Sequence, residues 1–380
     1  MGNDKKQKID PSCMKHKRTA ILLVFVLLIC LLSGCLDSDD EVDYENMPGK
    51  GKKVGIAMPT QNSERWIYDC SSIKEQLEAL GYRVVGQFAD DDVALQIGQI
   101  DQFISQKVDC LVIAAIDSTE LTAVEYKAQE AGIPIIAYDR LLMDTDAVSY
   151  YATFDNKRIG SAIAETIVAQ AKLQEIRKEG GHKTIEFFMG SPDDNNAIKI
   201  YEGLMEVLQP YLDDGTLVCR SGKISFEDTC ILRWSQDTAE ERCRSYLAEY
   251  YENEELDICA SAFDKFSYGC IQALEDAGYT EENWPIISGQ DAELEACRNI
   301  VNGKQSFTVY KDARLLAEKC VGMVNAICLG TEAEINDTTQ YNNNVKDVPS
   351  YLCTPVIVSS SNMKTIMIDG GYYQEEQVYE

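Results

Sequence analysis

Histidine is nearly absent from this chain, and positive charge is scarce. The 380 residues include two histidines, His16 and His182, and 35 lysines and arginines stand against 63 aspartates and glutamates, a formal net charge of −28. So few histidines argue against a multi-histidine metal site and against a Ser-His-Asp triad. The acidic balance argues against a nucleic-acid partner, which requires a positive surface. We expect no catalytic residues, no cofactor and no metal.

Closely spaced cysteine pairs are also missing. The chain has 14 cysteines, and setting aside Cys13, Cys30 and Cys35 leaves eleven, an odd number with no Cys-x-x-Cys pair among them. Several replace a small hydrophobic residue, as Cys110 and Cys259 do in apolar, strand-like runs. This pattern predicts mostly free, buried thiols rather than a disulfide framework.

The apolar run Ile21–Leu32 is too short to span a membrane. As a helix it would be about 18 Å long, whereas the hydrocarbon layer is about 30 Å thick. Basic residues precede this run, and Leu32-Ser33-Gly34-Cys35 follows it. The pattern predicts a signal peptide over residues 1–34 whose end resembles the lipobox of bacterial lipoproteins, with lipid attached to Cys35. The alternative is an ordinary cleavage site with a cysteine after it by chance.

Residues 35–52 are acidic, contain glycine and lack apolar periodicity. Such a segment is typical of a solvated tether. We therefore expect an extracytoplasmic protein that the lipid on Cys35 anchors to the cell membrane.

From Lys53 onward, short apolar runs alternate with amphipathic stretches of helical period. The expected strands are 54–58, 83–88, 110–115, 134–138, 185–189, 217–220, 258–263 and 285–288. The expected helices are 64–80, 93–106, 119–131, 197–208, 239–251 and 267–277. This alternation predicts an α/β fold with two doubly wound parallel-sheet domains, with helices on both faces of each sheet.

A weak internal duplication places aspartates at corresponding strand ends. Residues 109–139 and 257–291 each run strand, aspartate, helix, glycine and strand, and they end at Asp139 and Asp291. Ligands bind at this edge of open parallel sheets, and two facing edges form a cleft. We expect Asp139 and Asp291 to bind a ligand; the alternative is that they cap helices, as we expect of Asp117.

Two carboxylates facing each other suit a ligand with neighbouring hydroxyl groups, which donate hydrogen bonds. Arg140 and Lys311 supply donors, and Trp66 offers a flat apolar face for the C–H side of a sugar ring. Trp66 also lies on the apolar stripe of its helix, so core packing is an alternative role. Together these residues predict a neutral polyhydroxyl ligand.

Seven short motifs extend this pattern along the chain. They are Arg65-Trp66, Ala137-Tyr138-Asp139-Arg140, Phe154-Asp155-Asn156, Gly190-Ser191-Pro192 followed by Asp194-Asn195-Asn196-Ala197, Ser288-Gly289-Gln290-Asp291-Ala292, Thr308-Val309-Tyr310-Lys311 and Val348-Pro349-Ser350. In order and spacing they resemble the periplasmic D-xylose-binding and multiple-monosaccharide-binding proteins of ABC importers. The resemblance extends from about residue 53 to about residue 378.

The resemblance implies a type I periplasmic-binding-protein-like fold of two lobes, which close over one sugar and are joined by a three-crossing hinge. It places the crossings near 155–156, 291–292 and 310–311. It divides the chain into an N-terminal lobe of 53–155 plus 292–310 and a C-terminal lobe of 156–291 plus 311–380. It also implies a monomer that delivers its ligand to an ABC permease and the associated ATPase.

The resemblance implies a site of nine residues: Arg65, Trp66, Asp139, Arg140, Asn195, Asn196, Asp264, Asp291 and Lys311. One departure concerns the sugar. Ribose- and xylose-binding relatives carry Asn-Asp where this chain has Phe263-Asp264. The lost amide favours the multiple-sugar branch over strict xylose binding, so we expect an aldose such as xylose, glucose, galactose or arabinose.

Three other functions are conceivable. A glycosidase needs two carboxylates about 5–9.5 Å apart, whereas neighbours such as Asp193 and Asp194 usually point apart. The sugar-sensing half of a transcription repressor shares the fold but carries a helix-turn-helix where this chain has its lipobox. A sugar sensor that feeds a chemotaxis or two-component receptor differs only in its partner, so it stays open as the alternative function.

Overall fold

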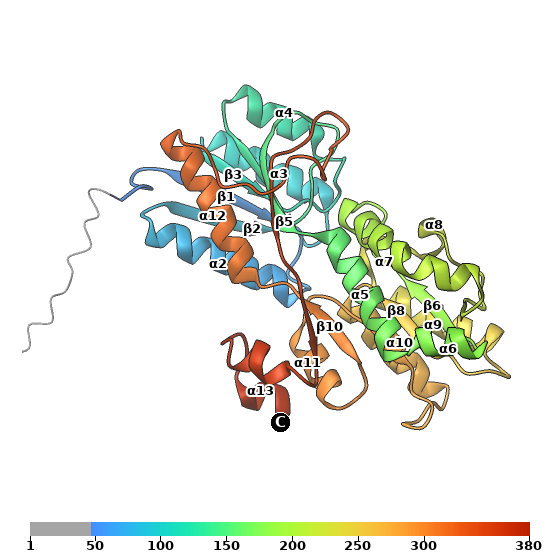
Figure 1. Ribbon diagram of the computed structural model, residues 1–380. Coiled ribbons are helices and arrows are strands. Elements are labelled where there is room, and N and C mark those ends of the chain that lie inside the picture. The colour runs from blue at the N-terminus through green and yellow to red at the C-terminus, as the bar shows by residue number, and fades with distance from the viewer. Residues whose placement is uncertain (1–46) are drawn as a thin grey trace, which may run out of the picture. The chain divides into compact units, whose positions relative to one another are not determined.

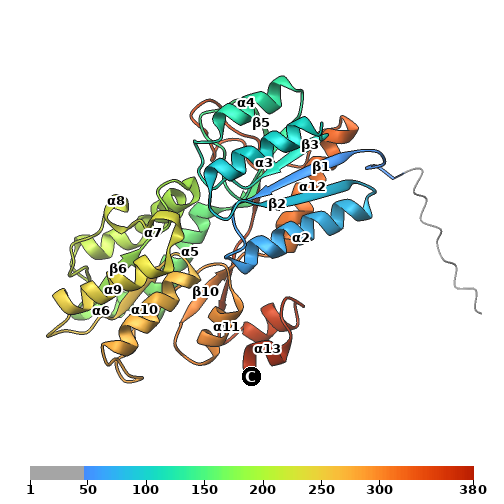
Figure 2. The same cartoon turned by 180° about the vertical axis from the view of Figure 1, so that it is seen from behind.

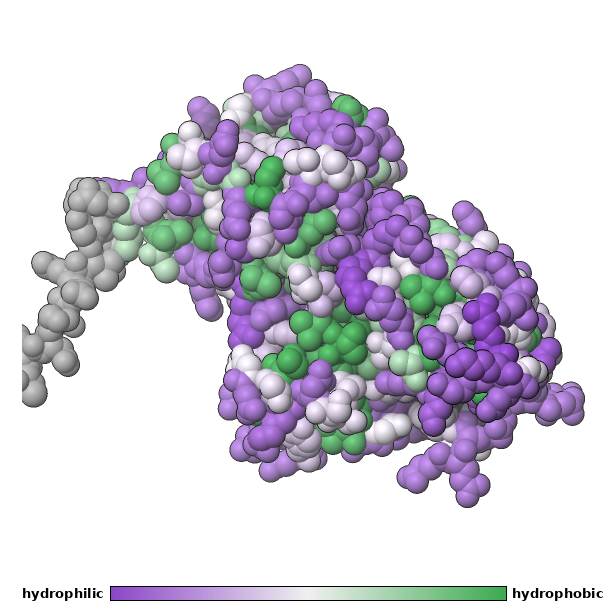
Figure 3. All heavy atoms as spheres, viewed as in Figure 1, coloured by the Kyte–Doolittle hydropathy of each residue, from purple (hydrophilic) through white to green (hydrophobic). Residues whose placement is uncertain are grey.

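The computed structural model describes residues 47–380, and Pro48–Glu380 form one compact unit (Figure 1). The expected signal peptide, the lipidation residue Cys35 and most of the tether lie outside the described residues. Within the described part, no helix combines the length and the apolar character needed to cross a membrane. Hydrophilic residues cover most of the face in Figure 3, in keeping with the acidic composition.

The first lobe is built on a six-stranded parallel sheet in the order β11-β5-β4-β3-β1-β2. Its strands are β1 (Lys53–Met58), β2 (Arg83–Phe88), β3 (Cys110–Ile113), β4 (Ile135–Tyr138), β5 (Val148–Phe154) and β11 (Ser350–Cys353). Its helices are α2 (Glu64–Ala79), α3 (Val93–Ser105), α4 (Thr122–Glu130) and α12 (Ala313–Leu329).

Alternation along the strands explains why helices cover both faces of this sheet. Val54 and Ile56 of β1 belong to the apolar cluster that contains buried residues of α2 and α12. Ala57, on the opposite side of the same strand, packs in the cluster formed with α3 and α4. Side chains point to alternate faces at each step of a strand, so an uninterrupted apolar run fills two cores.

The second lobe is built on a four-stranded parallel sheet in the order β7-β6-β8-β9. These strands are β6 (Lys183–Phe188), β7 (Leu217–Val218), β8 (Ile258–Ser261) and β9 (Ile286–Ile287). The antiparallel strands β10 (Phe307–Tyr310) and β12 (Val356–Ser359) adjoin it through a bridge between Gln290 and Val309.

Two helix pairs dominate the second lobe, α5 with α7 and α9 with α10 (Figure 2). Its helices are α5 (Asn156–Gln170), α6 (Leu173–Glu179), α7 (Asn195–Asp213), α8 (Phe226–Thr229), α9 (Gln236–Tyr250), α10 (Asp264–Asp276), α11 (Leu294–Val301) and α13 (Glu375–Tyr379), with a 3₁₀ turn at Leu232–Trp234 and a π-helical turn at Lys364–Ile368. Gly160 of α5 and Gly203 of α7 let the two backbones touch, because a Cβ on either would overlap a main-chain carbonyl of the other helix.

The chain passes between the lobes three times: at Asp155, at 311–312 and at 354–355. This differs from the expected division. Residues 292–310 belong to the second lobe, because α11 and β10 pack there, and 313–353 return to the first lobe, where α12 covers α2 and β11 pairs with β5. No crossing occurs at 291–292. Apolar periodicity shows that a helix covers a sheet without showing which sheet, so the sequence could not assign α12.

All eleven cysteines of the described part are free, as the sequence predicts. Eight of them are buried, including Cys110 and Cys259 within their strands. Buried thiols here fill positions of small hydrophobic residues.

Candidate functional site

A cavity of about 420 Å³ lies between the two lobes. Ligand pockets typically measure about 300–1,000 Å³. Its lining includes residues just past the C-terminal ends of strands in both sheets, such as Asp139 after β4, Asp194 after β6 and Gln290 after β9. The cavity therefore occupies the sheet edges at which the sequence predicts a ligand.

Arg65, in the first turn of α2, forms ion pairs with three aspartates. Its Nη2 donates a hydrogen bond to Asp139, its Nε lies 3.3 Å from Oδ2 of Asp69, and its Nη1 lies 3.5 Å from Oδ1 of Asp291. The side chain is 3% exposed. Burial alone would lower the pKa of Arg65, but the three carboxylates raise it well above its ordinary value. The guanidinium is thus held charged and in one orientation.

Two of these aspartates have opposite pKa shifts. Burial alone would raise the pKa of Asp139, but Arg65 and Lys311 outweigh it and lower that pKa to about 2. Burial outweighs Arg65 at Asp69 and raises the pKa of Asp69 to about 6. Tyr138 donates a 2.6 Å hydrogen bond to Oδ1 of Asp69. Asp69 therefore positions Arg65 from behind, a role that its i+4 spacing on α2 could have suggested.

Asp291 and Lys311 form a second buried ion pair. Nζ of Lys311 lies 2.8 Å from Oδ1 of Asp291, and both residues line the cavity. Asp291 is not the N-cap of the next helix, because α11 starts after Glu293. Its φ of 96° is a left-handed conformation that Asn and Gly also adopt readily. The geometry therefore favours a ligand role for Asp291 over helix capping.

Asn196, in the first turn of α7, connects the lobes beside the cavity. Its Nδ2 donates to the main-chain oxygen of Asp139 at 2.8 Å, and its Oδ1 accepts from Nδ2 of Asn156 at 2.9 Å. Asp194 caps the same helix and lies 3.1 Å from Nε of Arg140. These hydrogen bonds and the ion pair fix the orientation of Asn196, Asn156 and Arg140 before a ligand binds.

Two tryptophans provide apolar faces. Trp66 lines the cavity and packs in the first-lobe core, with the guanidinium carbons of Arg65 and Arg140 at 5.1 and 5.3 Å from its ring centroid. Trp234, which sequence reasoning missed, stacks on Phe266 with centroids 5.8 Å apart. Its buried Nε1 has no hydrogen-bond partner among the described residues, and the residue lines the cavity.

Seven of the nine expected site residues line the cavity, and Asn195 and Asp264 do not. Asp264 is fully buried; its Oδ1 accepts hydrogen bonds from Gln305 and Thr308, and its Oδ2 accepts one from the main-chain nitrogen of Glu293. Burial raises its pKa well above the ordinary value. Phe263 takes the cavity-facing position instead. The expectation for Asp264 is corrected: it ties α10 to β10 and α11.

Several cavity residues adopt strained backbone conformations. Left-handed φ angles occur at five non-glycine residues that line the cavity: Asp91, Asp139, Arg233, Trp234 and Asp291. Such conformations cost about 1–3 kcal/mol each and persist where the surrounding structure imposes them, often at functional sites. Arg233 and Trp234 are consecutive and both left-handed, a backbone conformation that neither residue type favours. The sequence therefore gives no local signal that places Trp234 at the cavity.

Four further hydrogen bonds join the lobes around the cavity and are called here the closing contacts. They are Ser63 Oγ to Glu293 Oε1 at 2.9 Å, Lys265 Nζ to the carbonyl of Asn62, Arg233 Nη1 to the carbonyl of Ile116 at 3.1 Å, and Ser118 N to the carbonyl of Asp193 at 3.1 Å. They hold the lobes in a closed arrangement.

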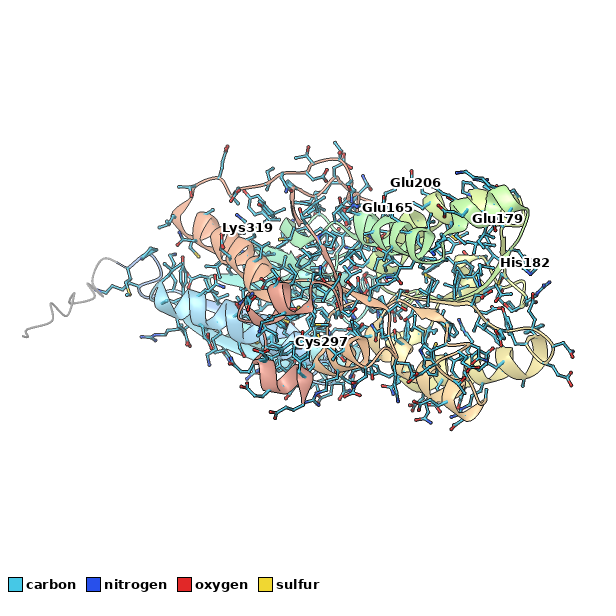
Figure 4. All side chains as sticks on the ribbon, turned by 60° about the horizontal axis from the view of Figure 1, so that its bottom comes forward. Glu165, Glu179, His182, Glu206, Cys297 and Lys319 are labelled. Atoms are coloured by element: carbon cyan, nitrogen blue, oxygen red, sulfur yellow. The ribbon has the colours of Figure 1, made fainter. Side chains whose placement is uncertain are left out.

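No histidine of the described part lines the cavity: His182 lies at the outer end of the second lobe (Figure 4), 2.9 Å from Glu254. Of the five aspartates that line the cavity, Asp139, Asp194 and Asp291 each face a cationic side chain. This arrangement suits hydrogen bonding to a neutral polar ligand rather than metal coordination. Among the described residues, one group of at least three potential metal ligands lies close together, the cysteines Cys243, Cys259 and Cys270 in the second-lobe core.

Residues 54–332 match the periplasmic binding protein domain family. The chain belongs to this family. It is 44% identical over 327 residues to the multiple sugar-binding periplasmic receptor ChvE of Rhizobium radiobacter, covering 86% of this chain and 92% of the relative. It is 34% identical over 331 residues to the D-xylose-binding periplasmic protein of Escherichia coli, covering 87% and 93%.

Among solved structures, the chain is similar to an ABC transporter solute binding protein from Clostridium phytofermentans with bound β-D-glucose. The TM-score is 0.83 at 43% identity, covering 86% of this chain and all of that one. The predicted family and fold class are confirmed. The family consists of extracytoplasmic binding receptors rather than enzymes, so the expected lack of an enzymatic function is also confirmed.

Proposed function

We propose that this protein is an extracytoplasmic receptor that binds one neutral monosaccharide in the cavity between its lobes and delivers it to an ABC permease and its ATPase. The observation that carries the proposal is the composition of the cavity wall. Asp139 and Asp291 accept hydrogen bonds, Arg65, Arg140 and Lys311 donate them, and two indoles supply flat faces. Hydroxyl groups pair with both kinds of charged partner, and C–H faces stack on indoles.

The wall also explains why the ligand should be neutral. Each cationic side chain among Arg65, Arg140 and Lys311 already has a carboxylate partner. A charged ligand would leave one of these buried charges without compensation, which is costly in a closed cavity. A sugar adds hydrogen bonds without changing the charge balance.

Several aldoses, rather than xylose alone, are the proposed ligands. Support comes from Phe263, which presents an apolar ring at the cavity. The family resemblance implies an amide at this position in xylose-binding relatives. It also comes from the higher identity to the multiple sugar-binding receptor, 44%, than to the D-xylose-binding protein, 34%.

Isothermal titration calorimetry with D-glucose, D-galactose, L-arabinose and D-xylose tests the proposal. We expect saturable heat with one site per chain and no turnover. Asp139→Asn should weaken binding at least about tenfold, since a charged hydrogen bond contributes about 1.5–3 kcal/mol. Asp101→Asn, at a partly exposed residue that pairs with Lys127 outside the cavity, is the matched control. Heat from an amino acid or a nucleoside, with none from any aldose, would contradict the proposal.

A lipid anchor at Cys35 and a monomeric state complete the proposal. The anchor rests on the lipobox-like Leu32-Ser33-Gly34-Cys35, and the monomer on a cavity that one chain lines on both sides. Cys35→Ala should release the protein from membranes, whereas Cys30→Ala, within the apolar run, should not. Retention of the Cys35→Ala variant would refute the anchor, and light scattering that gives twice the chain mass would refute the monomer.

A further inference from the structure

The core of the second lobe contains three cysteines whose sulfur atoms gather at one point. Cys243 lies on α9, Cys259 on β8 and Cys270 on α10, so residues far apart in the chain are brought together. Their three Sγ atoms all lie within 4.8 Å of one another, and each residue is fully buried. Figure 2 shows α9 and α10 running side by side in this lobe.

We propose that Cys243, Cys259 and Cys270 form a binding site for one soft, thiophilic monovalent cation, with Cu(I) as the ion that fits best. Soft sulfur ligands select soft metals. Three sulfurs at about 2.3 Å from a central ion, the usual metal–thiolate distance, lie roughly 4 Å apart in a planar arrangement. The observed spacing accommodates such an ion with small side-chain adjustments.

The number of ligands separates Cu(I) from zinc. Structural zinc sites are almost always four-coordinate, with tetrahedral geometry. In the described residues, no fourth histidine, cysteine or carboxylate atom joins the cluster. The surroundings are apolar, including Phe188 and Leu274, so they leave little provision for a coordinated water. A three-sulfur site of this kind suits an ion that accepts trigonal coordination.

The position of the cluster gives the ion a structural consequence. The same helices reach the sugar cavity at their N-terminal ends, where Gln236 and Asp237 of α9 and Lys265, next to the first residue of α10, line its wall. An ion bound by α9, β8 and α10 would cross-link the part of the second lobe that carries these residues. Binding should therefore raise the thermal stability of the protein.

The test is a titration of the anaerobically reduced protein with Cu(I) in the presence of a competing Cu(I) chelator, which keeps weak thiol sites empty. We compare the wild type with Cys270→Ala and with Cys320→Ala, a buried cysteine on α12 outside the cluster. The wild type and Cys320→Ala should each bind one equivalent and show a higher unfolding temperature. Cys270→Ala should bind at least a hundredfold more weakly and show no rise.

X-ray absorption at the copper edge of the wild type provides a readout independent of variant folding, and it should report three sulfur neighbours. The proposal is overturned if Cu(I) is not retained against the chelator, or if Cys270→Ala retains it as well as the wild type does. Tighter binding of Zn²⁺ than of Cu(I), or a disulfide between two of the three cysteines in the anaerobically purified protein, would also overturn it.

Discussion

Gly190 lies directly against Trp234, so that a Cβ atom at position 190 would overlap the six-membered ring of the indole. The loop after β6 and the strained turn that carries Trp234 therefore fit together only when residue 190 has no side chain. This contact fixes the position of an indole that lines the cavity and whose N–H has no partner among the described residues.

Gly190→Ala should therefore weaken sugar binding by displacing Trp234. Overpacking costs typically about 1–3 kcal/mol, so we expect at least about fivefold lower affinity in calorimetry, with the fold retained. Gly98→Ala is the control, since a Cβ at that helical position meets no other atom within 4 Å, and it should bind normally. Unchanged affinity in Gly190→Ala would show that the indole does not contact the sugar.

Asp291→Asn should weaken binding at least about tenfold, equivalent to about 1.4 kcal/mol. The substitution removes a charge paired with Lys311 and Arg65 while keeping a residue that tolerates the left-handed backbone. Asp291→Ala would mix this effect with backbone strain. Calorimetry gives the affinity, and a melting curve of the sugar-free protein gives the stability. A lower melting temperature with full affinity would assign Asp291 to the fold alone.

Asp69→Asn should lower the affinity for the sugar even though Asp69 itself does not contact the sugar. Asp69 does not line the cavity, but its Oδ2 lies 3.3 Å from Nε of Arg65. Without the charge, Arg65 should be less well oriented, and we expect a loss of about fivefold. Structural damage alone would lower the melting temperature with and without sugar equally, so the sugar-induced increase in melting temperature separates the two effects. An unchanged increase would contradict the positioning role.

The closing contact at Glu293 should make stability depend on pH. Burial, aided by the neighbouring carboxylates of Asp291 and Glu64, raises the pKa of Glu293 to about 7. Lys265 and the hydrogen bond that Ser63 donates to the carboxylate oppose this rise without cancelling it. The folded state then holds a proton that the unfolded state releases at about 4.5. This contribution to stability is complete below pH 4.5 and is lost as pH rises through about 7.

Glu293→Gln isolates the effect, because an amide resembles the protonated carboxyl group. Relative to the wild type, the variant should gain stability between pH 5 and pH 8, by up to about 3 kcal/mol for a shift of this size. Denaturant unfolding at both pH values measures the difference. A difference that does not change with pH would refute the pKa assignment, and Glu75→Gln, at an exposed residue of α2, serves as the control.

The sequence could predict the strands, the helices and much of the site because these depend on local patterns. Asp139 and Asp291 follow apolar strands, and the edge of a parallel sheet fixes where such residues lie. Trp234 could not be found this way, since its position depends on two consecutive left-handed residues and on Gly190. Asp264 is the opposite case: its place in a family motif predicts that it contacts the ligand, but its side chain accepts hydrogen bonds from Gln305 and Thr308 inside the second lobe. The motif alone does not show which way a side chain points.

The threading of the chain has a consequence for the order of assembly. The first lobe needs α12 and β11, which follow the second lobe's continuous segment of 156–310, whereas that segment supplies all four strands of its parallel sheet. As the chain emerges from its N-terminus, β5 has an unpaired outer edge until residue 353 arrives. An unpaired edge invites association with other chains. The second lobe can therefore complete its parallel sheet before the first lobe does, although the first lobe begins earlier in the sequence.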